Sequence, residues 1–234
     1  MVPALFSFAA LQRASFRYTP CYCEENVWRL CDDLLQQQGQ WQQQLQDVVL
    51  DSLDGQSWEL SAVFVSNPKR QVAMWCQRAG KGSLTFGMSN FVLWDYHVFA
   101  VLETEDRRSY ILDLDTTLEP FLLPFIDYAE KALRPECLAD CKDFPKRFFR
   151  VVPGREYLQS LCSDRSHMLT AEGTYSISPP SEAPILCTRE GCADGRTSNL
   201  FSHFVSMDGT TGVGQVFDEP CFLQRFGCPL RTSN

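Results

Sequence analysis

The chain has few histidines, few basic residues and no long apolar run, and each shortage excludes a class of protein. Three of its 234 residues are histidine, and 21 lysines and arginines stand against 29 aspartates and glutamates, for a net charge of −8. A nucleic-acid site needs a clustered basic face, and the densest basic stretch is the short KRFFR at 146–150, so we expect no nucleic-acid partner. No stretch reaches the roughly 20 apolar residues of a membrane span, so we expect no membrane partner.

The cysteines are numerous but lack the regular spacing of a disulfide framework. There are 11 of them, an odd number in a long chain, and we interpret most as reduced thiols in a cytosolic setting. A structural zinc site would need paired Cys-x-x-Cys or Cys/His clusters. The nearest approximations are Cys137 with Cys141 and Cys187 with Cys192, whose spacing does not match. We therefore expect no metal site.

The first 20 residues differ in character from the rest of the chain. They carry an apolar stretch followed by Arg13 and Arg17 and contain no acid, which is the reverse of the charge order in a signal peptide. We interpret residues 1–20 as an N-terminal tail, with an organelle leader as the alternative. With 44% hydrophobic residues and no long linker, residues 21–234 are expected to form one domain.

The periodicity of the chain predicts helices and strands in an α+β arrangement. Residues 23–38 carry apolar residues at helical spacing, with two acids in the first turn. The glutamine-rich stretch at 36–46 has no strong period, and we favour a solvated insertion over a helix extension. Apolar runs bounded by turn residues predict two neighbouring strands at 61–67 and 71–77. Two further runs, at 91–103 and 109–117, predict a β-hairpin.

Three short segments supply a thiol, an imidazole and two carboxylates. Cys23 lies at the expected helix start, where free N–H groups and the helix dipole lower the pKa of a thiol. His97 and the pair Asp113 and Asp115 lie on the two strands of the expected hairpin, where facing side chains come within about 5 Å. Together they can supply the nucleophile, base and orienting acid of a cysteine hydrolase. The alternatives are a buried structural cysteine and a hydrogen-bonded structural histidine.

The segments that carry these residues resemble the protein N-terminal glutamine amidohydrolases. WDYHV at 94–98 is similar to the motif that gives the family its name, CYCEEN at 21–26 to its nucleophile segment, and DLDT at 113–116 to its acid segment. Four further segments are similar and occur in the family's order: VFVSN at 63–67, SDRSHM at 163–168, FVSMD at 204–208 and RFG at 225–227. The resemblance therefore covers nearly the whole chain.

The resemblance implies a fold, a reaction and a catalytic triad. The fold is an antiparallel sheet packed with helices, on a scaffold like that of papain and the transglutaminases, so that 21–234 is a single catalytic domain. The reaction is deamidation of the N-terminal glutamine of proteins and peptides to glutamate, with release of ammonia, through a thioester. The triad is Cys23 as nucleophile, His97 as base and Asp113 as orienting acid, with Asp115 as the alternative acid.

The same resemblance implies the setting of the enzyme. It requires no metal and no cofactor, and its partners are chains that begin with glutamine. We expect a monomer in the cytoplasm, with the nucleus as a further location, that feeds an arginylation-dependent degradation pathway of the N-degron type. A transglutaminase- or protease-like thiol enzyme on the same scaffold, or a non-catalytic peptide-binding module, remains as the alternative.

Selectivity for an N-terminal residue requires recognition of its free α-ammonium group by an acceptor. The candidates are Glu24, Asp95 and Asp164, each with a structural alternative: a helix-dipole partner for the first, a turn or hydrogen-bond residue for the second, and a partner of the neighbouring Arg165 or a turn cap for the third. We expect His167 to hold structure.

Strand alternation predicts how the WDYHV segment faces. Asp95 and His97 should point to the catalytic cleft, and Trp94, Tyr96 and Val98 should pack under the helices.

Overall fold

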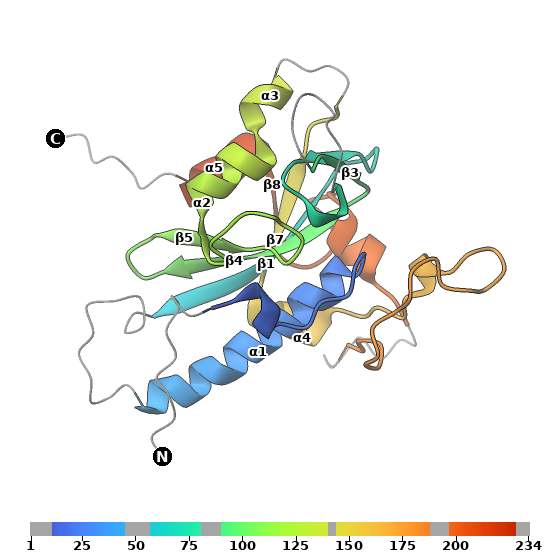
Figure 1. Ribbon diagram of the computed structural model, residues 1–234, viewed down its shortest axis with the longest axis horizontal. Coiled ribbons are helices and arrows are strands. Elements are labelled where there is room, and N and C mark those ends of the chain that lie inside the picture. Colours follow the sequence, from blue (N-terminus) through green and yellow to red (C-terminus); the bar gives the residue numbers. More distant parts are fainter. Residues whose placement is uncertain (1–10, 45–56, 81–89, 140–143, 188–196, 228–234) are drawn as a thin grey trace.

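A six-stranded antiparallel sheet forms the centre of the protein (Figure 1). The computed structural model describes residues 11–44, 57–80, 90–139, 144–187 and 197–227. The strands run in the order β6-β5-β4-β1-β7-β8, and two further strands, β2 and β3, pair separately. Their bounds are β1 (Trp58–Ser66), β2 (Val72–Met74), β3 (Val92–Trp94), β4 (His97–Thr104), β5 (Ser109–Leu112), β6 (Leu123–Pro124), β7 (Phe148–Pro153) and β8 (Gln215–Asp218).

Helices cover both faces of this sheet (Figure 1). Helices α1 (Cys23–Gln44) and α4 (Gly154–Ser160) lie on one face, and α2 (Phe125–Tyr128) and α5 (Glu219–Gly227) lie on the other. This arrangement confirms the predicted α+β class with an antiparallel sheet packed with helices. The likeness to papain and the transglutaminases stays a prediction. The remaining helical pieces are α3 (Pro135–Ala139), three short 3-10 turns (Arg13–Ser15, Arg78–Gly80, Ser166–Met168) and two π-helical segments (Ala129–Leu133, Leu200–Val205).

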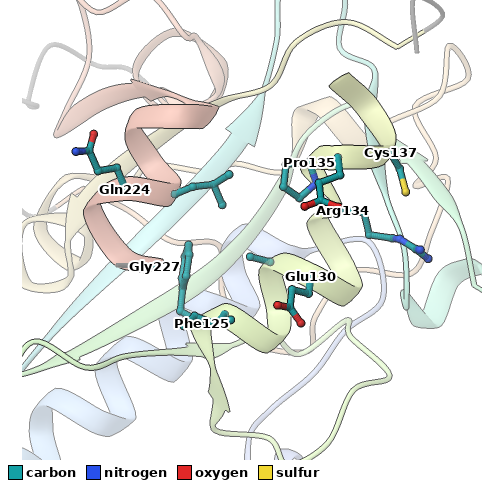
Figure 2. A pocket seen from close by; sticks show the side chains of 11 residues that line it. Phe125, Glu130, Arg134, Pro135, Cys137, Gln224 and Gly227 are labelled. Carbon is teal, nitrogen blue, oxygen red and sulfur yellow. The ribbon is translucent and has the colours of Figure 1, made fainter. Parts of the chain in front are cut away.

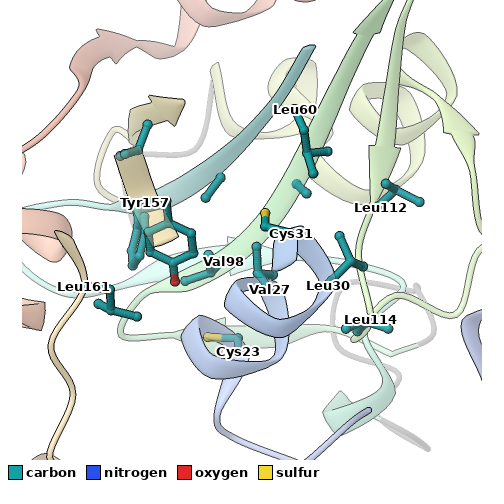
Figure 3. Close-up of a cluster of buried hydrophobic side chains, with 14 of the residues drawn as sticks. Cys23, Val27, Leu30, Cys31, Leu60, Val98, Leu112, Leu114, Tyr157 and Leu161 are labelled. Atoms are coloured by element: carbon teal, nitrogen blue, oxygen red, sulfur yellow. The ribbon is translucent and has the colours of Figure 1, made fainter. Parts of the chain in front are cut away.

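The central strands are apolar on both faces and separate two hydrophobic cores. Because side chains alternate along a strand, Phe64 and Val98 point to the core beneath α1 and α4, which Figure 3 shows around Val27 and Tyr157. Phe99, one residue after Val98, points instead to the core beneath α2 and α5. Strands buried on both faces read as continuous apolar runs, and this makes β1 and β4 recognisable in the sequence.

The predicted hairpin is present, but the first of its strands is interrupted. Strands β4 and β5 pair antiparallel, with Ala100 opposite Leu112. The run at 91–103 is not one strand, because β3 ends at Trp94 and β4 begins at His97. Between them, the Asp95 carboxylate accepts a hydrogen bond from the N–H of Tyr96 at 2.9 Å, a local side-chain bond that competes with a strand ladder. The predicted neighbour at 71–77 contributes β2, which pairs with β3 and not with β1.

The glutamine-rich stretch continues α1 through Gln44, so the favoured prediction of a solvated insertion is wrong there. Glutamine has a good intrinsic helix propensity, and a helix can therefore continue without an apolar period. The end of the stretch, 45–46, lies outside the described residues. None of the helices that the structure describes combines the length and the apolar character needed to cross a membrane.

Part of the N-terminal segment packs on the domain. Phe16 and Tyr18 contact the core beneath α1, and Arg13 forms an ion pair with Glu119. The cysteines Cys137 and Cys187 are free thiols, and their nearest sequence partners, Cys141 and Cys192, lie outside the described residues.

Candidate active site

Cys23 is the first residue of α1 and lies almost completely inside the protein, with 7% of its surface exposed (Figure 3). The turn that leads into the helix is held by Asn26, whose side chain accepts from the N–H of Thr19 at 2.9 Å and donates to its carbonyl at 2.8 Å. The backbone N–H of Val98, in β4, donates a hydrogen bond to the Cys23 sulfur. The helix start is thereby fixed against the strand that begins with His97.

The environment of Cys23 favours the neutral thiol. Burial raises the pKa of Cys23 well above its usual range, the charges of Glu24 and Asp115 raise it further, and the Val98 N–H acts in the opposite direction. The predicted lowering of this pKa by the helix start is therefore wrong, because loss of water and two nearby carboxylates outweigh the helix N–H groups. The thiol itself lies 3.8 Å from a carboxylate oxygen of Glu24. Nucleophilic chemistry at this sulfur needs a base to remove its proton.

His97 and Asp113 form a hydrogen-bonded pair from which water is excluded. The His97 Nε2 atom lies 3.0 Å from Asp113 Oδ1, and neither residue is exposed. The Asp113 carboxylate also accepts from the Tyr128 hydroxyl at 2.8 Å and from the Asp115 N–H at 2.9 Å. If the β4–β5 ladder continued past Leu112, its register would place Asp115 opposite His97. The strand ends at Leu112 instead, and Asp113 becomes the hydrogen-bond partner.

The electrostatics of this pair stabilise the imidazolium form of His97 relative to an isolated histidine. Burial lowers the pKa of His97, but the charge of Asp113 and its hydrogen bond outweigh burial, so that the pKa lies above its ordinary value. Burial raises the pKa of Asp113, but His97 and the hydrogen-bond donors outweigh it and hold that pKa below its usual range. The indole of Trp94 stacks on the His97 ring at 5.3 Å. The second ring nitrogen, His97 Nδ1, is buried and has no hydrogen-bond partner among the described residues, so it is available for proton exchange.

Asp115 is a second buried carboxylate beside this pair. It accepts a hydrogen bond from the Tyr18 hydroxyl at 2.6 Å, and burial raises its pKa. His97, Asp113 and Asp115 present ligand atoms within 4.8 Å of one another, a spacing that could hold a metal ion. The bonds from Asp113 to His97 and from Tyr18 to Asp115 already occupy several of these atoms. We interpret the cluster as a hydrogen-bond network, in which only Asp113 contacts the imidazole by a hydrogen bond.

A cavity of about 460 Å³ opens onto Cys23, a volume typical of small-ligand sites. We call it the catalytic cavity. The residues that line it are Cys21, Cys23, Arg70, Trp94, Asp95, Tyr96, Asp115, His167, Met168 and Phe201. A larger cavity of about 570 Å³ lies between α2 and α5, where Figure 2 shows Phe125, Glu130 and Gln224 around it. That cavity is not lined by any of the predicted catalytic residues.

Two of the three predicted ammonium-binding carboxylates lie at or beside the catalytic cavity. Asp95 is exposed and lines it. Glu24 is completely buried next to the nucleophile: one oxygen accepts from the Tyr96 hydroxyl at 2.9 Å, and the other lies 3.5 Å from His167 Nε2. That second oxygen has no hydrogen-bond partner among the described residues. His167, expected to hold structure, also lines the cavity.

The third candidate, Asp164, does not line the catalytic cavity. Its carboxylate accepts from the N–H of Ser166 at 2.9 Å and from the hydroxyl of Thr197 at 2.5 Å. Its neighbour Arg165 pairs with Glu25, at 2.6 and 2.8 Å, and not with Asp164. The buried Glu25–Arg165 pair was not predicted, although both residues lie in the segments CYCEEN and SDRSHM that carried the resemblance. It joins the start of α1 to the segment that carries His167.

The WDYHV segment does not alternate as predicted. Trp94, Asp95 and Tyr96 all line the catalytic cavity, and Tyr96 also packs with Val98 in the core beneath α1 and α4. Tyr96 and Val98 pack under the helices as predicted, and Asp95 lines the cavity as predicted. The rest of the prediction is wrong, because Trp94 and Tyr96 line the cavity too, whereas His97 is buried and is not among its lining residues. Alternation applies to an extended strand, and the chain between β3 and β4 is not one.

The chain is similar to a described family over most of its length. Residues 18–226 match the family described as N-terminal glutamine amidase. The protein N-terminal glutamine amidohydrolase of Drosophila grimshawi is 35% identical over 219 residues, which cover 91% of this chain and 89% of the relative. Proteins of the same name from Drosophila erecta and Drosophila melanogaster are each 36% identical, over 222 and 218 residues, covering 91% and 89% of this chain and 89% and 87% of the relatives.

Proposed function

This chain belongs to the N-terminal glutamine amidase family, and from that premise we propose that it hydrolyses the side-chain carboxamide of an N-terminal glutamine, leaving glutamate and releasing ammonia. We assign Cys23, His97 and Asp113 as nucleophile, base and orienting acid. The observation that carries this assignment is the buried 3.0 Å bond between His97 Nε2 and Asp113 Oδ1, next to the strand residue whose N–H bonds the Cys23 sulfur. It leaves His97 Nδ1 free to exchange a proton with the thiol.

The reaction begins with a neutral thiol and a base. His97 accepts the proton of Cys23, and the thiolate attacks the carboxamide carbon of the bound glutamine. The backbone N–H groups at the first turn of α1 stabilise the negative oxygen of the tetrahedral intermediate. The imidazolium, held by Asp113, then donates its proton to the leaving nitrogen, and ammonia departs. A thioester between Cys23 and the former side chain remains.

A water molecule completes the reaction by hydrolysing the thioester. His97, neutral again, removes a proton from a water molecule that attacks the thioester. The second tetrahedral intermediate collapses, the thiolate leaves and takes a proton from His97, and the product carries an N-terminal glutamate. Every proton passes through one imidazole, so the orientation of His97 by Asp113 matters in both halves of the reaction.

The carboxylates around the cavity support recognition of a cationic N-terminus. Glu24, Asp95 and Asp115 place negative charge beside Cys23, where the α-ammonium of the substrate would lie. The same charges raise the pKa of the thiol. A bound ammonium offsets them, so the correct substrate assists deprotonation of its own nucleophile. Asp164 does not line the cavity, and we propose no substrate contact for it.

The wider setting follows from the proposed product. A new N-terminal glutamate is the kind of chain end that an arginylation-dependent degradation pathway would take, and we propose that the enzyme feeds such a pathway as a monomer in the cytoplasm and nucleus.

A set of three peptides tests the proposed reaction. One begins with glutamine, the second is the same peptide with an acetylated N-terminus, and the third carries glutamine only at an internal position. We expect ammonia and the mass change of an amide converted to an acid with the first peptide alone. Deamidation of the internal glutamine, or its crosslinking to an added amine, would point to a transglutaminase-like enzyme and overturn the proposal. Cleavage of a main-chain amide bond would point to a protease.

A further inference from the structure

A second cavity of about 460 Å³ adjoins the catalytic cavity and shares two of its lining residues, Arg70 and Phe201. We call it the adjoining cavity. Its lining combines apolar side chains, two hydroxyls and the amide of Asn67 with one carboxylate, that of Asp208. The remaining lining residues are Ser66, Asn67, Pro68, Val205, Ser206 and Met207. A substrate held by its first residue in the catalytic cavity has to lead the rest of its chain away from Cys23, and the adjoining cavity opens directly beside it.

Arg70, at the junction of the two cavities, is held in an unusual backbone conformation. Its φ of 51° lies in the left-handed region, which costs free energy for a residue other than glycine. The turn is built by the Asn67 side chain, which donates to the carbonyl of Gln71 at 2.7 Å and accepts from the N–H groups of Lys69 and Gln71 at 3.0 and 3.2 Å. The preceding Ser66 hydroxyl donates to the carbonyl of Asp95 at 2.9 Å. The turn is thus tied to the catalytic segment.

The guanidinium of Arg70 stacks on Phe201 with its donors available. Its central carbon lies 4.4 Å from the centre of the Phe201 ring. No hydrogen bond or ion pair to that guanidinium is seen within the described residues. Phe201 also meets the rings of Tyr96 and His167 edge-on, at 5.8 and 5.6 Å, so the residue that supports Arg70 is itself packed on the catalytic cavity. A planar cation stacked in this way is positioned for carboxylates and carbonyl oxygens.

Each of the two cavities that meet at Arg70 is lined by a negatively charged side chain. Asp95 lines the catalytic cavity, and Asp208 lines the adjoining one. Without Arg70, a chain that left the catalytic cavity would pass two carboxylates and favour basic residues. With it, the junction presents a positive charge between them.

On the basis of the proposed function, we propose that the adjoining cavity takes the residues that follow the N-terminal glutamine, and that Arg70 makes the enzyme favour an acidic over a basic second residue. The occupant is an extended peptide segment, whose carbonyl oxygens and acidic side chain are the acceptors that Arg70 lacks within the protein. Because Arg70 is exposed, the selectivity is modest: an exposed ion pair changes kcat/KM by about two- to fivefold.

A matched pair of peptides tests this proposal. They begin Gln-Glu and Gln-Lys and are otherwise identical, and kcat/KM for ammonia release is measured on each. For the wild-type enzyme we expect a Glu-to-Lys ratio of about two to five. In Arg70→Ala the ratio should fall to one or below, because Asp95 and Asp208 are then unopposed, and Arg70→Lys should retain part of the preference. Lys69→Ala is the control: it removes an exposed cation one residue away that lines neither cavity, and its ratio should equal that of the wild type.

Further measurements separate the failure of this proposal from failure of the proposed function. The KM of the wild type should fall from glutamine amide to a glutamine tripeptide, because only the longer substrate reaches the adjoining cavity. If the wild type deamidates the peptides but shows neither this length dependence nor a preference that Arg70→Ala removes, the adjoining cavity is not the peptide subsite. If the wild type deamidates none of them, the proposed function itself fails. A thermal melt establishes that Arg70→Ala is folded.

Discussion

Asp113→Asn should leave the protein folded but remove most of its activity. The carboxylate receives three hydrogen bonds, two at Oδ1 from His97 and Asp115 and one at Oδ2 from Tyr128. An asparagine oxygen can keep the first two, and its NH2 group can donate to the Tyr128 hydroxyl after that hydroxyl rotates. The substitution is therefore sterically tolerated. What it removes is the negative charge opposite the imidazole.

The size of the effect follows from the electrostatics of His97. Burial lowers the pKa of His97, and the charge and hydrogen bond of Asp113 hold it above the ordinary value of 6.5. Without that charge burial prevails, and each pKa unit lost costs 1.36 kcal/mol of imidazolium stabilisation, or about tenfold in rate. Because the amide no longer stabilises the imidazolium that forms in both halves of the reaction, we expect kcat to fall by about 10³- to 10⁴-fold.

The assay compares ammonia release from a Gln-initiated peptide by the wild type, Asp113→Asn and the matched variant Asp115→Asn. Asp115 bonds Tyr18 and makes no hydrogen bond to the imidazole, so its variant should lose far less activity. Since neutral His97 is the active base, kcat/KM of the wild type should rise with pH through a pKa above 6.5, and in Asp113→Asn that limb should move to lower pH. Equal, small losses in the two variants, with no movement of the limb, would refute the orienting role of Asp113.

Three further predictions concern the nucleophile and the buried charges. Cys23→Ala should be inactive yet folded, with a stability loss of about 1 kcal/mol, while Cys21→Ala should keep most activity; the reverse pattern in the peptide assay would put the nucleophile two residues earlier. Glu25→Gln should destabilise the protein by about 3–5 kcal/mol in urea unfolding, because it leaves the buried Arg165 without its charged partner, and an unchanged midpoint would contradict this. Arg150→Met should cost about 3 kcal/mol or more, because Arg150 donates to four backbone carbonyls of the loop at 206–213, and proteolysis of that loop should become faster.

Much of the fold could be predicted where local pattern and tertiary structure agree. The helical period between Cys23 and Leu35 and the apolar runs of β1 and β4 are strong signals, because the apolar side chains of these segments pack in the core. The break at Asp95 could not be predicted, since apolar residues continue on both sides of it and a single side-chain bond to Tyr96 ends the ladder. The extension of α1 was missed because polar residues leave no period after Leu35.

The candidate site could also be predicted only in part. Cys23, His97 and Asp113 could be proposed because each lies in a short motif with a recognisable chemistry. The pairings behind them could not, since Glu24 with Tyr96 and Glu25 with Arg165 join segments far apart in the chain. The direction of the pKa shift of the Cys23 thiol could not be predicted from the sequence either. A helix start suggests a lowered pKa, and only the packing around Cys23 shows that burial and neighbouring carboxylates raise it.

The most direct test of the proposed mechanism is capture of the thioester. A Gln-initiated peptide is mixed with the wild-type enzyme, the reaction is stopped with acid within the first turnover, and the enzyme is digested and weighed by mass spectrometry. We predict an adduct on the fragment that contains Cys23, with the mass of the peptide less one ammonia, and no adduct on Cys23→Ala or with the acetylated peptide. Complete deamidation by Cys23→Ala, or an adduct on another residue, would contradict a mechanism through this thiol.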